Sequence, residues 1–84
     1  MRDSGKATKD SILSAIKDID DYTRIVKQEL TCIMAEAEAL SDVWKDDKYN
    51  RFIEHLDKLR LSVENELSML EYTRIQLKEK ADLM

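Results

Sequence analysis

The fold is decided by the stretch Ser41-Asp42-Val43-Trp44-Lys45-Asp46-Asp47-Lys48, near the middle of the 84-residue chain. Short polar residues gather here, and they favour a turn where glycine and proline are absent. Proline does not occur in the sequence and Gly5 is its only glycine, so nothing after Lys6 forces a break in a helix. We therefore predict the turn here, with Asp46 or Asp47 capping the helix that follows.

Apolar residues precede this turn in a regular rhythm of four and three. Such steps keep residues on one face of a helix, and repeated over several heptads they specify a packing seam. Thr8 or Asp10 is placed to cap the start of this helix. Thr23 is the one polar member of the seam, which consists of Ile12, Ile16, Ile19, Thr23, Val26, Leu30, Ile33, Ala37, Leu40 and Trp44.

A second seam follows the turn and runs through Phe52, Leu56, Leu59, Val63, Glu66, Leu70, Thr73 and Leu77. Glu66 is its imperfect position, where we expect the neighbouring Leu67 to rotate into the seam. The sequence thus predicts an all-α fold with a helix over about 8–41, a turn over about 42–47 and a helix over about 48–82. A turn this short makes the helices antiparallel, in a single hairpin about 50 Å long. The structural alternative is one uninterrupted helix.

A short internal repeat, whose two copies we call the echo segments, is consistent with an antiparallel hairpin. Asp21-Tyr22-Thr23-Arg24-Ile25 recurs as Glu71-Tyr72-Thr73-Arg74-Ile75, and a central turn would place the two segments side by side. Two interpretations stay open. Either Thr23 and Thr73 form one polar layer between the helices, or the similarity is a coincidence between two amphipathic helices.

Further apolar residues lie outside both seams, although one hairpin needs only one apolar stripe on each helix. A wider stripe indicates that more helices pack against the hairpin, and we therefore expect association into a four-helix bundle. A chain of this length with a lone Cys32, and so no internal disulfide, also favours a partner as its stabiliser. The additional apolar residues are Leu13, Tyr22, Ile25, Met34, Ile53, Leu61, Leu67, Met69, Tyr72 and Ile75.

Composition excludes several classes of function. The net charge is −4, and Lys and Arg are interleaved with Asp and Glu, so there is no basic stripe for a nucleic acid. No stretch approaches the roughly 20 apolar residues of a membrane span. Cys32 and His55 are single representatives of their types, which leaves a zinc site without ligands, and no glycine-rich loop could hold a phosphate. We expect no catalysis, no cofactor, no metal and no small-molecule substrate.

Trp44 is the sequence's only tryptophan and sits at the predicted turn. Two roles stay open for it. Its ring could cover the open end of the seam by packing on Leu40 and Phe52, or it could anchor a partner protein, as large aromatic side chains at interfaces often do.

The turn also carries a family resemblance. Trp44-Lys45-Asp46 followed by Phe52, set between two amphipathic helices, resembles the W-x-G family, the small helical-hairpin proteins of bacterial type VII secretion that include the early secreted antigens. The family pattern has glycine where this chain has Asp46, and an aromatic residue eight positions after the tryptophan. Its C-terminal export signal is a tyrosine followed four residues later by an acidic residue. Tyr72 fits this signal, whereas Gln76 occupies the acidic position.

The resemblance implies a helical protein that pairs hairpin against hairpin, as a homodimer or a heterodimer. Because Gln76 lacks the acidic charge, it favours a targeting factor or chaperone that binds the N-terminal helical domain of a larger secreted toxin. The alternatives are a self-sufficient secreted homodimer of the W-x-G type and an unrelated intracellular coiled-coil adaptor. Residues 1–10 contain no apolar run, so we expect synthesis in the cytoplasm and any export to proceed without a classical signal peptide.

Overall fold

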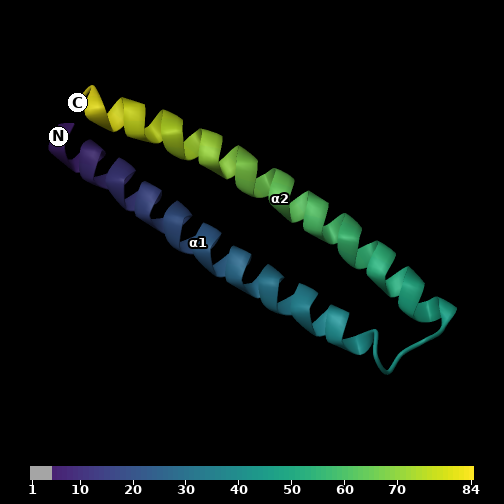
Figure 1. Cartoon of the computed structure of the whole chain (residues 1–84). Helices are drawn as coiled ribbons and strands as arrows, with labels where there is room; N and C mark the ends of the chain where they lie inside the picture. Colours follow the sequence, from purple (N-terminus) through teal and green to yellow (C-terminus); the bar gives the residue numbers. More distant parts are fainter. Residues whose placement is uncertain (1–4) are drawn as a thin grey trace.

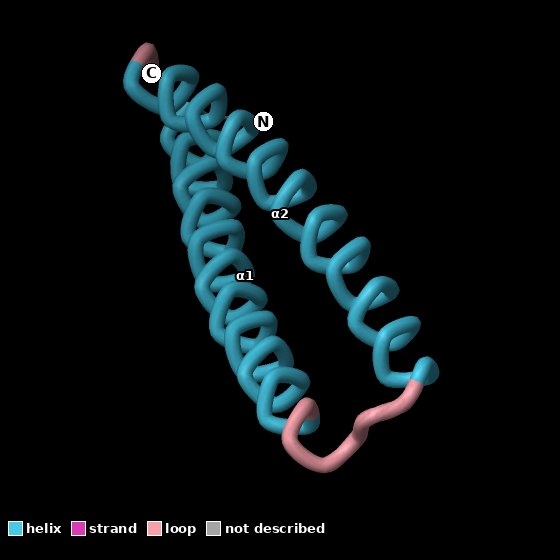
Figure 2. The backbone as a smooth tube through the Cα atoms, turned by 45° about the vertical axis from the view of Figure 1, so that its right-hand side comes forward, coloured by secondary structure: helices cyan, strands magenta, loops and turns pink. Residues whose placement is uncertain are grey.

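Two long helices packed side by side make up the structure. The computed structural model describes residues 5–84, with α1 spanning Gly5–Leu40 and α2 spanning Asp47–Asp82. Residues 41–46 join them at one end, and the chain termini lie together at the other (Figures 1 and 2). The predicted antiparallel hairpin is confirmed, and an uninterrupted helix is excluded. The hairpin measures 63 × 19 × 16 Å along its principal axes, which is the length of one long helix and the width of two helices side by side.

The start of α1 differs from the sequence prediction. The helix already begins at Gly5, so Thr8 and Asp10 lie within it and neither is its N-cap. Residues 1–4 belong to the stretch on which the expectation about a signal peptide rests, and they lie outside the described residues.

The α1 seam follows the prediction near the termini and departs from it towards the turn. Ile12 and Ile16 are buried, but Ile33 and Leu40 are 40% and 39% exposed, so their assignment to the seam is wrong. A helix has 3.6 residues per turn, so a strict seven-residue repeat drifts around it by about 20° per heptad. Beyond Leu30, the contact with α2 therefore passes through Met34 and Ser41 instead of Ile33 and Leu40. The residues that are buried or half-buried along the contact are, on α1, Ile12, Ile16, Ile19, Thr23, Val26, Leu30, Met34 and Ala37, with Ser41 directly after its end.

The α2 seam is shifted in the same way at every second position. Leu59 is 49% exposed and Glu66 is also exposed, while Leu67 is buried, as expected. The prediction that Leu59 lies in the seam is wrong, because the residue after Leu56 that contacts α1 is four positions later, at Arg60, and not three positions later. The α2 residues along the contact are Leu56, Arg60, Val63, Leu67, Leu70, Arg74, Leu77 and Ala81. Arg60 and Arg74 cover the seam with their aliphatic stems while their charged ends reach water.

The hairpin core is thin. Its main cluster lies near the termini, where Ile12, Ile16 and Ala81 are buried and Leu77 packs against them. Ala81 is 0% exposed, and so small a side chain lets the helices approach closely. Among the described residues only six hydrophobic side chains are buried, and no large one falls below 2% exposure. Burial between α1 and α2 alone therefore stabilises this chain only modestly.

An ion pair joins the helices beside the two echo segments. Arg74 Nε donates to Asp20 Oδ1 at 2.6 Å, so the segments 21–25 and 71–75 do lie side by side. The pKa of the Arg74 guanidinium is raised by this hydrogen bond to the carboxylate. Thr73 is exposed and its hydroxyl donates to the Met69 carbonyl of its own helix. In place of a polar layer of Thr23 and Thr73, an interhelical pair joins Asp20, three residues before Thr23, to Arg74, the residue after Thr73.

Candidate functional site

Asp46 organises the turn. Its backbone is extended, with φ −130° and ψ 179°, and its carboxylate accepts from the backbone N–H groups of Lys48 and Tyr49 at 2.9 and 3.2 Å. This makes Asp46, rather than Asp47, the N-cap of α2. The same Oδ1 atom also accepts the indole N–H of Trp44 at 2.9 Å. One carboxylate oxygen therefore starts the second helix and holds the tryptophan ring in place.

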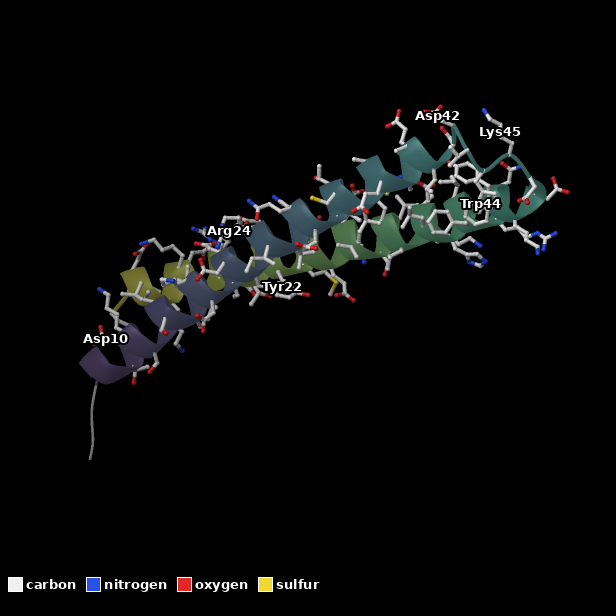
Figure 3. All side chains as sticks on the ribbon, turned by 90° about the horizontal axis from the view of Figure 1, so that it is seen from below. Asp10, Tyr22, Arg24, Asp42, Trp44 and Lys45 are labelled. Carbon is white, nitrogen blue, oxygen red and sulfur yellow. The ribbon has the colours of Figure 1, made fainter. Side chains whose placement is uncertain are left out.

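Three aromatic rings meet at this end of the hairpin. Trp44 stacks on Phe52 with ring centroids 5.7 Å apart, and Tyr49 meets Trp44 edge-on at 5.6 Å. The Tyr49 hydroxyl donates across to the Ala37 carbonyl of α1 at 3.0 Å. Figure 3 shows Trp44 directed from the turn towards α2, whereas Asp42 and Lys45 project outwards. We refer to Trp44, Asp46, Tyr49 and Phe52 as the tip cluster.

The structure brings together the three turn-motif residues named from the sequence. Trp44, Asp46 and Phe52 contact one another directly or through one neighbour. Trp44 stacks on Phe52, as its covering role requires, and its backbone N–H donates to the Leu40 carbonyl at 2.9 Å. Sequence reasoning missed Tyr49. The available signal was its spacing, since an aromatic residue one helical turn before Phe52 shares that residue's face.

The backbone at Asp46 shows why glycine is dispensable at this position. Its φ is negative, in a region open to every residue, so no left-handed conformation demands glycine. Aspartate adds the cap and the indole acceptor, which a glycine could not supply.

Replacing Asp46 with alanine should therefore lower the free energy of unfolding by about 1 kcal/mol or somewhat more, through loss of the cap. Asp46→Asn retains an oxygen acceptor and should cost much less. Urea denaturation followed by circular dichroism measures both. Equal stability of the alanine variant and the parent protein would contradict the capping role.

Tyr72 and Gln76, the residues matched to the export signal, lie one turn apart on the surface of α2. Tyr72 is 64% exposed, and the Gln76 amide donates to its hydroxyl at 3.1 Å. They form a small polar and aromatic surface near the C-terminal end of the chain, far from the tip cluster.

Two grooves flank the contact between α1 and α2. The first is lined by Asp18, Ile19, Tyr22, Glu66, Met69 and Leu70, and the second by Thr23, Lys27, Leu30, Thr31, Glu64, Leu67, Ser68 and Glu71. Two packed helices leave one groove on each side, so these mark opposite sides of the hairpin. The first groove carries an exposed apolar surface, with Tyr22 53% and Met69 63% exposed. The second is lined by six polar or charged residues and two leucines.

We call the side with the first groove the Tyr22 face. Its residues recur at steps of three and four, which place them on the same flank of each helix. All of them are exposed. On α1 the Tyr22 face consists of Asp18, Tyr22, Ile25, Glu29, Ile33, Glu36 and Leu40, and on α2 of Leu59, Ser62, Glu66, Met69 and Thr73.

The described residues hold no group of three or more His, Cys, Asp or Glu side chains arranged to bind a metal ion. Within the same part of the chain, neither helix has the length and apolar character needed to cross a membrane. Comparison with protein-family models, curated proteins and solved structures finds no match.

Proposed function

We propose that this protein is a non-enzymatic helical partner protein that binds the helices of another protein to build a four-helix bundle. The observation that carries the proposal is that few apolar side chains are buried between α1 and α2, while many large ones are exposed. Burial between two helices leaves large apolar side chains in water on both, and extensive exposed apolar surface on a soluble protein marks an interaction site. The exposed members on the two helices include Tyr22, Ile25, Leu59, Leu61, Met69, Tyr72 and Ile75.

The accessible area supports this proposal. A compact monomer of 9.8 kDa would expose about 5,200 Å², whereas the hairpin exposes 6459 Å². The difference, on the order of 1,300 Å², exceeds the roughly 800 Å² that one partner contributes to a standard interface. A second pair of helices laid along the hairpin would cover an area of this size.

A more specific role rests on the W-x-G resemblance. We propose a targeting factor or chaperone of a type VII-like secretion system, which binds the N-terminal helical domain of a larger secreted toxin. The tip cluster supports it, because Asp46 fulfils the structural needs of the turn without glycine. Tyr72 and Gln76 support it as well, since they share one exposed surface at the spacing of the export signal. A partner would then supply the acidic residue that Gln76 replaces.

Solution mass tests the partner role. Light scattering after size exclusion is measured on the protein alone and after co-expression with the products of neighbouring genes. We expect a stable complex with a neighbour that carries a helical domain. A well-folded monomer at all concentrations, with no complex formed, would contradict the proposal. A self-sufficient homodimer would instead favour the independently secreted W-x-G type.

Export tests the secretion role. Deleting the gene should abolish delivery of the co-encoded toxin to the medium, and re-expression should restore it. Toxin synthesis inside the cell serves as the control. Undiminished delivery of every co-encoded substrate would favour the intracellular coiled-coil adaptor.

A further inference from the structure

The charges of the hairpin are divided between its sides. Six ion pairs occur among the described residues, and none includes a member of the Tyr22 face. Arg74 reaches Asp20 at 2.6 Å across the helices, and Arg60 bridges Asp57 and Glu64 along α2. On those surfaces Lys and Arg side chains lie beside the acidic ones, as is usual for a solvated helix surface.

No residue of the Tyr22 face takes part in an ion pair, although the pKa of the Lys17 amine, raised mainly by its hydrogen bond to Asp21, is also raised by the nearby Asp18. The charged residues among those named for the face are Asp18, Glu29, Glu36 and Glu66, with no Lys or Arg between them, and the same steps of three and four lead on α2 to Arg51 and Lys80 at the two ends of the face. Its apolar residues alternate with these carboxylates along α1, so that each of Tyr22, Ile25 and Ile33 lies within four residues of an acidic side chain. Figure 3 shows Tyr22 and Arg24, which belongs to an ion pair with Asp21, leaving α1 on different sides.

We propose that the Tyr22 face binds an amphipathic helical segment of another protein whose apolar stripe is flanked by Lys or Arg. This inference rests on the proposed function and specifies the partner's chemistry. The apolar residues of the face would be buried, and the basic residues of the partner would meet the four carboxylates at the edges of the contact. Charge complementarity of this kind selects the partner and accelerates association.

The same charges disfavour a second copy of this chain as the occupant. Symmetric pairing through one surface puts that surface against itself. The Tyr22 face would then bring eight carboxylates from two copies into one interface, with no basic residue of the face between them. Like charges opposed at an interface reject a partner.

The test uses two designed helical hairpins that share one apolar stripe and differ only in the residues beside it, Lys in one and Glu in the other. Binding to the intact protein is measured by titration calorimetry at low and at high salt. We expect the Lys-flanked hairpin to bind at least about tenfold more tightly at low salt, and the preference to shrink as salt screens the charges.

Matched double variants locate the effect. Glu29→Lys with Glu66→Lys, both on the Tyr22 face, should reverse the preference between the two hairpins. Glu38→Lys with Glu54→Lys produces the same net charge at exposed positions outside this face and should leave the preference unchanged. Circular dichroism verifies that all variants remain helical.

Three results would overturn the inference, and they separate it from the proposed function. Equal binding of both hairpins, unaffected by Glu29→Lys and Glu66→Lys, would refute the charge assignment while leaving helix binding intact. A homodimer that is disrupted by Tyr22→Glu and not displaced by the Lys-flanked hairpin would make a second copy the occupant. Binding of neither hairpin by a monomeric protein would refute this inference, and continued failure to form a complex with any neighbouring gene product would refute the proposed function as well.

Discussion

Replacing Leu67 with alanine should lower the free energy of unfolding by about 2–5 kcal/mol, whereas Leu59→Ala should lower it by only about 1 kcal/mol or less. Leu67 is 8% exposed and Leu59 is 49% exposed. Truncating a buried side chain loses its burial and leaves a cavity between the helices. Truncating a half-exposed side chain loses much less buried area, because water already contacts about half of it. The seam predicted from the sequence contains Leu59 and recruits Leu67, which would make the two losses similar, so this comparison separates pattern from packing.

Urea denaturation at one fixed protein concentration measures both variants, because association would add its own stabilisation. Leu59→Ala also tests partner binding, because Leu59 belongs to the Tyr22 face. It should weaken binding of the Lys-flanked hairpin while the fold stays close to its original stability. If Leu59→Ala destabilised the isolated chain as much as Leu67→Ala, the four-residue step along α2 would be incorrect.

Trp44→Ala has the second largest expected effect, a loss of about 2–4 kcal/mol in the free energy of unfolding. Two ring contacts contribute about 0.5–1.5 kcal/mol each beyond their area, and the hydrogen bond to Asp46 adds about 1 kcal/mol. Helicity should persist below the unfolding transition because α1 and α2 still pack along their length. The unfolding midpoint, followed by circular dichroism, is the measurement.

Trp44→Phe is the matched control. A phenyl ring can still stack on Phe52 but cannot donate to the Asp46 carboxylate, so this variant should lose only about 1 kcal/mol. Equal losses for both variants would mean that the hydrogen bond, and not the stacking, accounts for the role of Trp44. No loss for either would make the tip cluster irrelevant to stability and would leave partner binding as the reason for the tryptophan.

Most of the architecture could be predicted because local rules and the global fold agree. The absence of proline and the long apolar rhythms predicted two helices, and the polar cluster around Trp44 predicted the turn between them. Capping chemistry restricted the start of α2 to Asp46 or Asp47. Each of these inferences depends on residues close together in the sequence, where backbone geometry and side-chain chemistry are well defined.

The contact between the helices was harder to predict. Positions three and four residues away from a seam residue are equally close to it on a helix, so Leu59 and Arg60 compete for the same place. Apolarity favours Leu59, yet the structure places the Arg60 stem in the seam and leaves Leu59 half in water. The choice between Leu59 and Arg60 depends on how α1 is rotated about its own axis opposite them, and the local sequence of α2 carries no information about that rotation.

The amino-acid sequence by itself thus determined the helices, the turn and an aspartate cap at Asp46 or Asp47, because these follow from propensity, spacing and capping within a few residues. Only the tertiary structure decided that Asp46 is the cap, which flank of each helix is buried, that Tyr49 completes the tip cluster, and that the carboxylates of the Tyr22 face form no ion pair. Those features arise from the rotation of two helices about their axes, and a rotation of a few tens of degrees moves a residue from the seam to the surface.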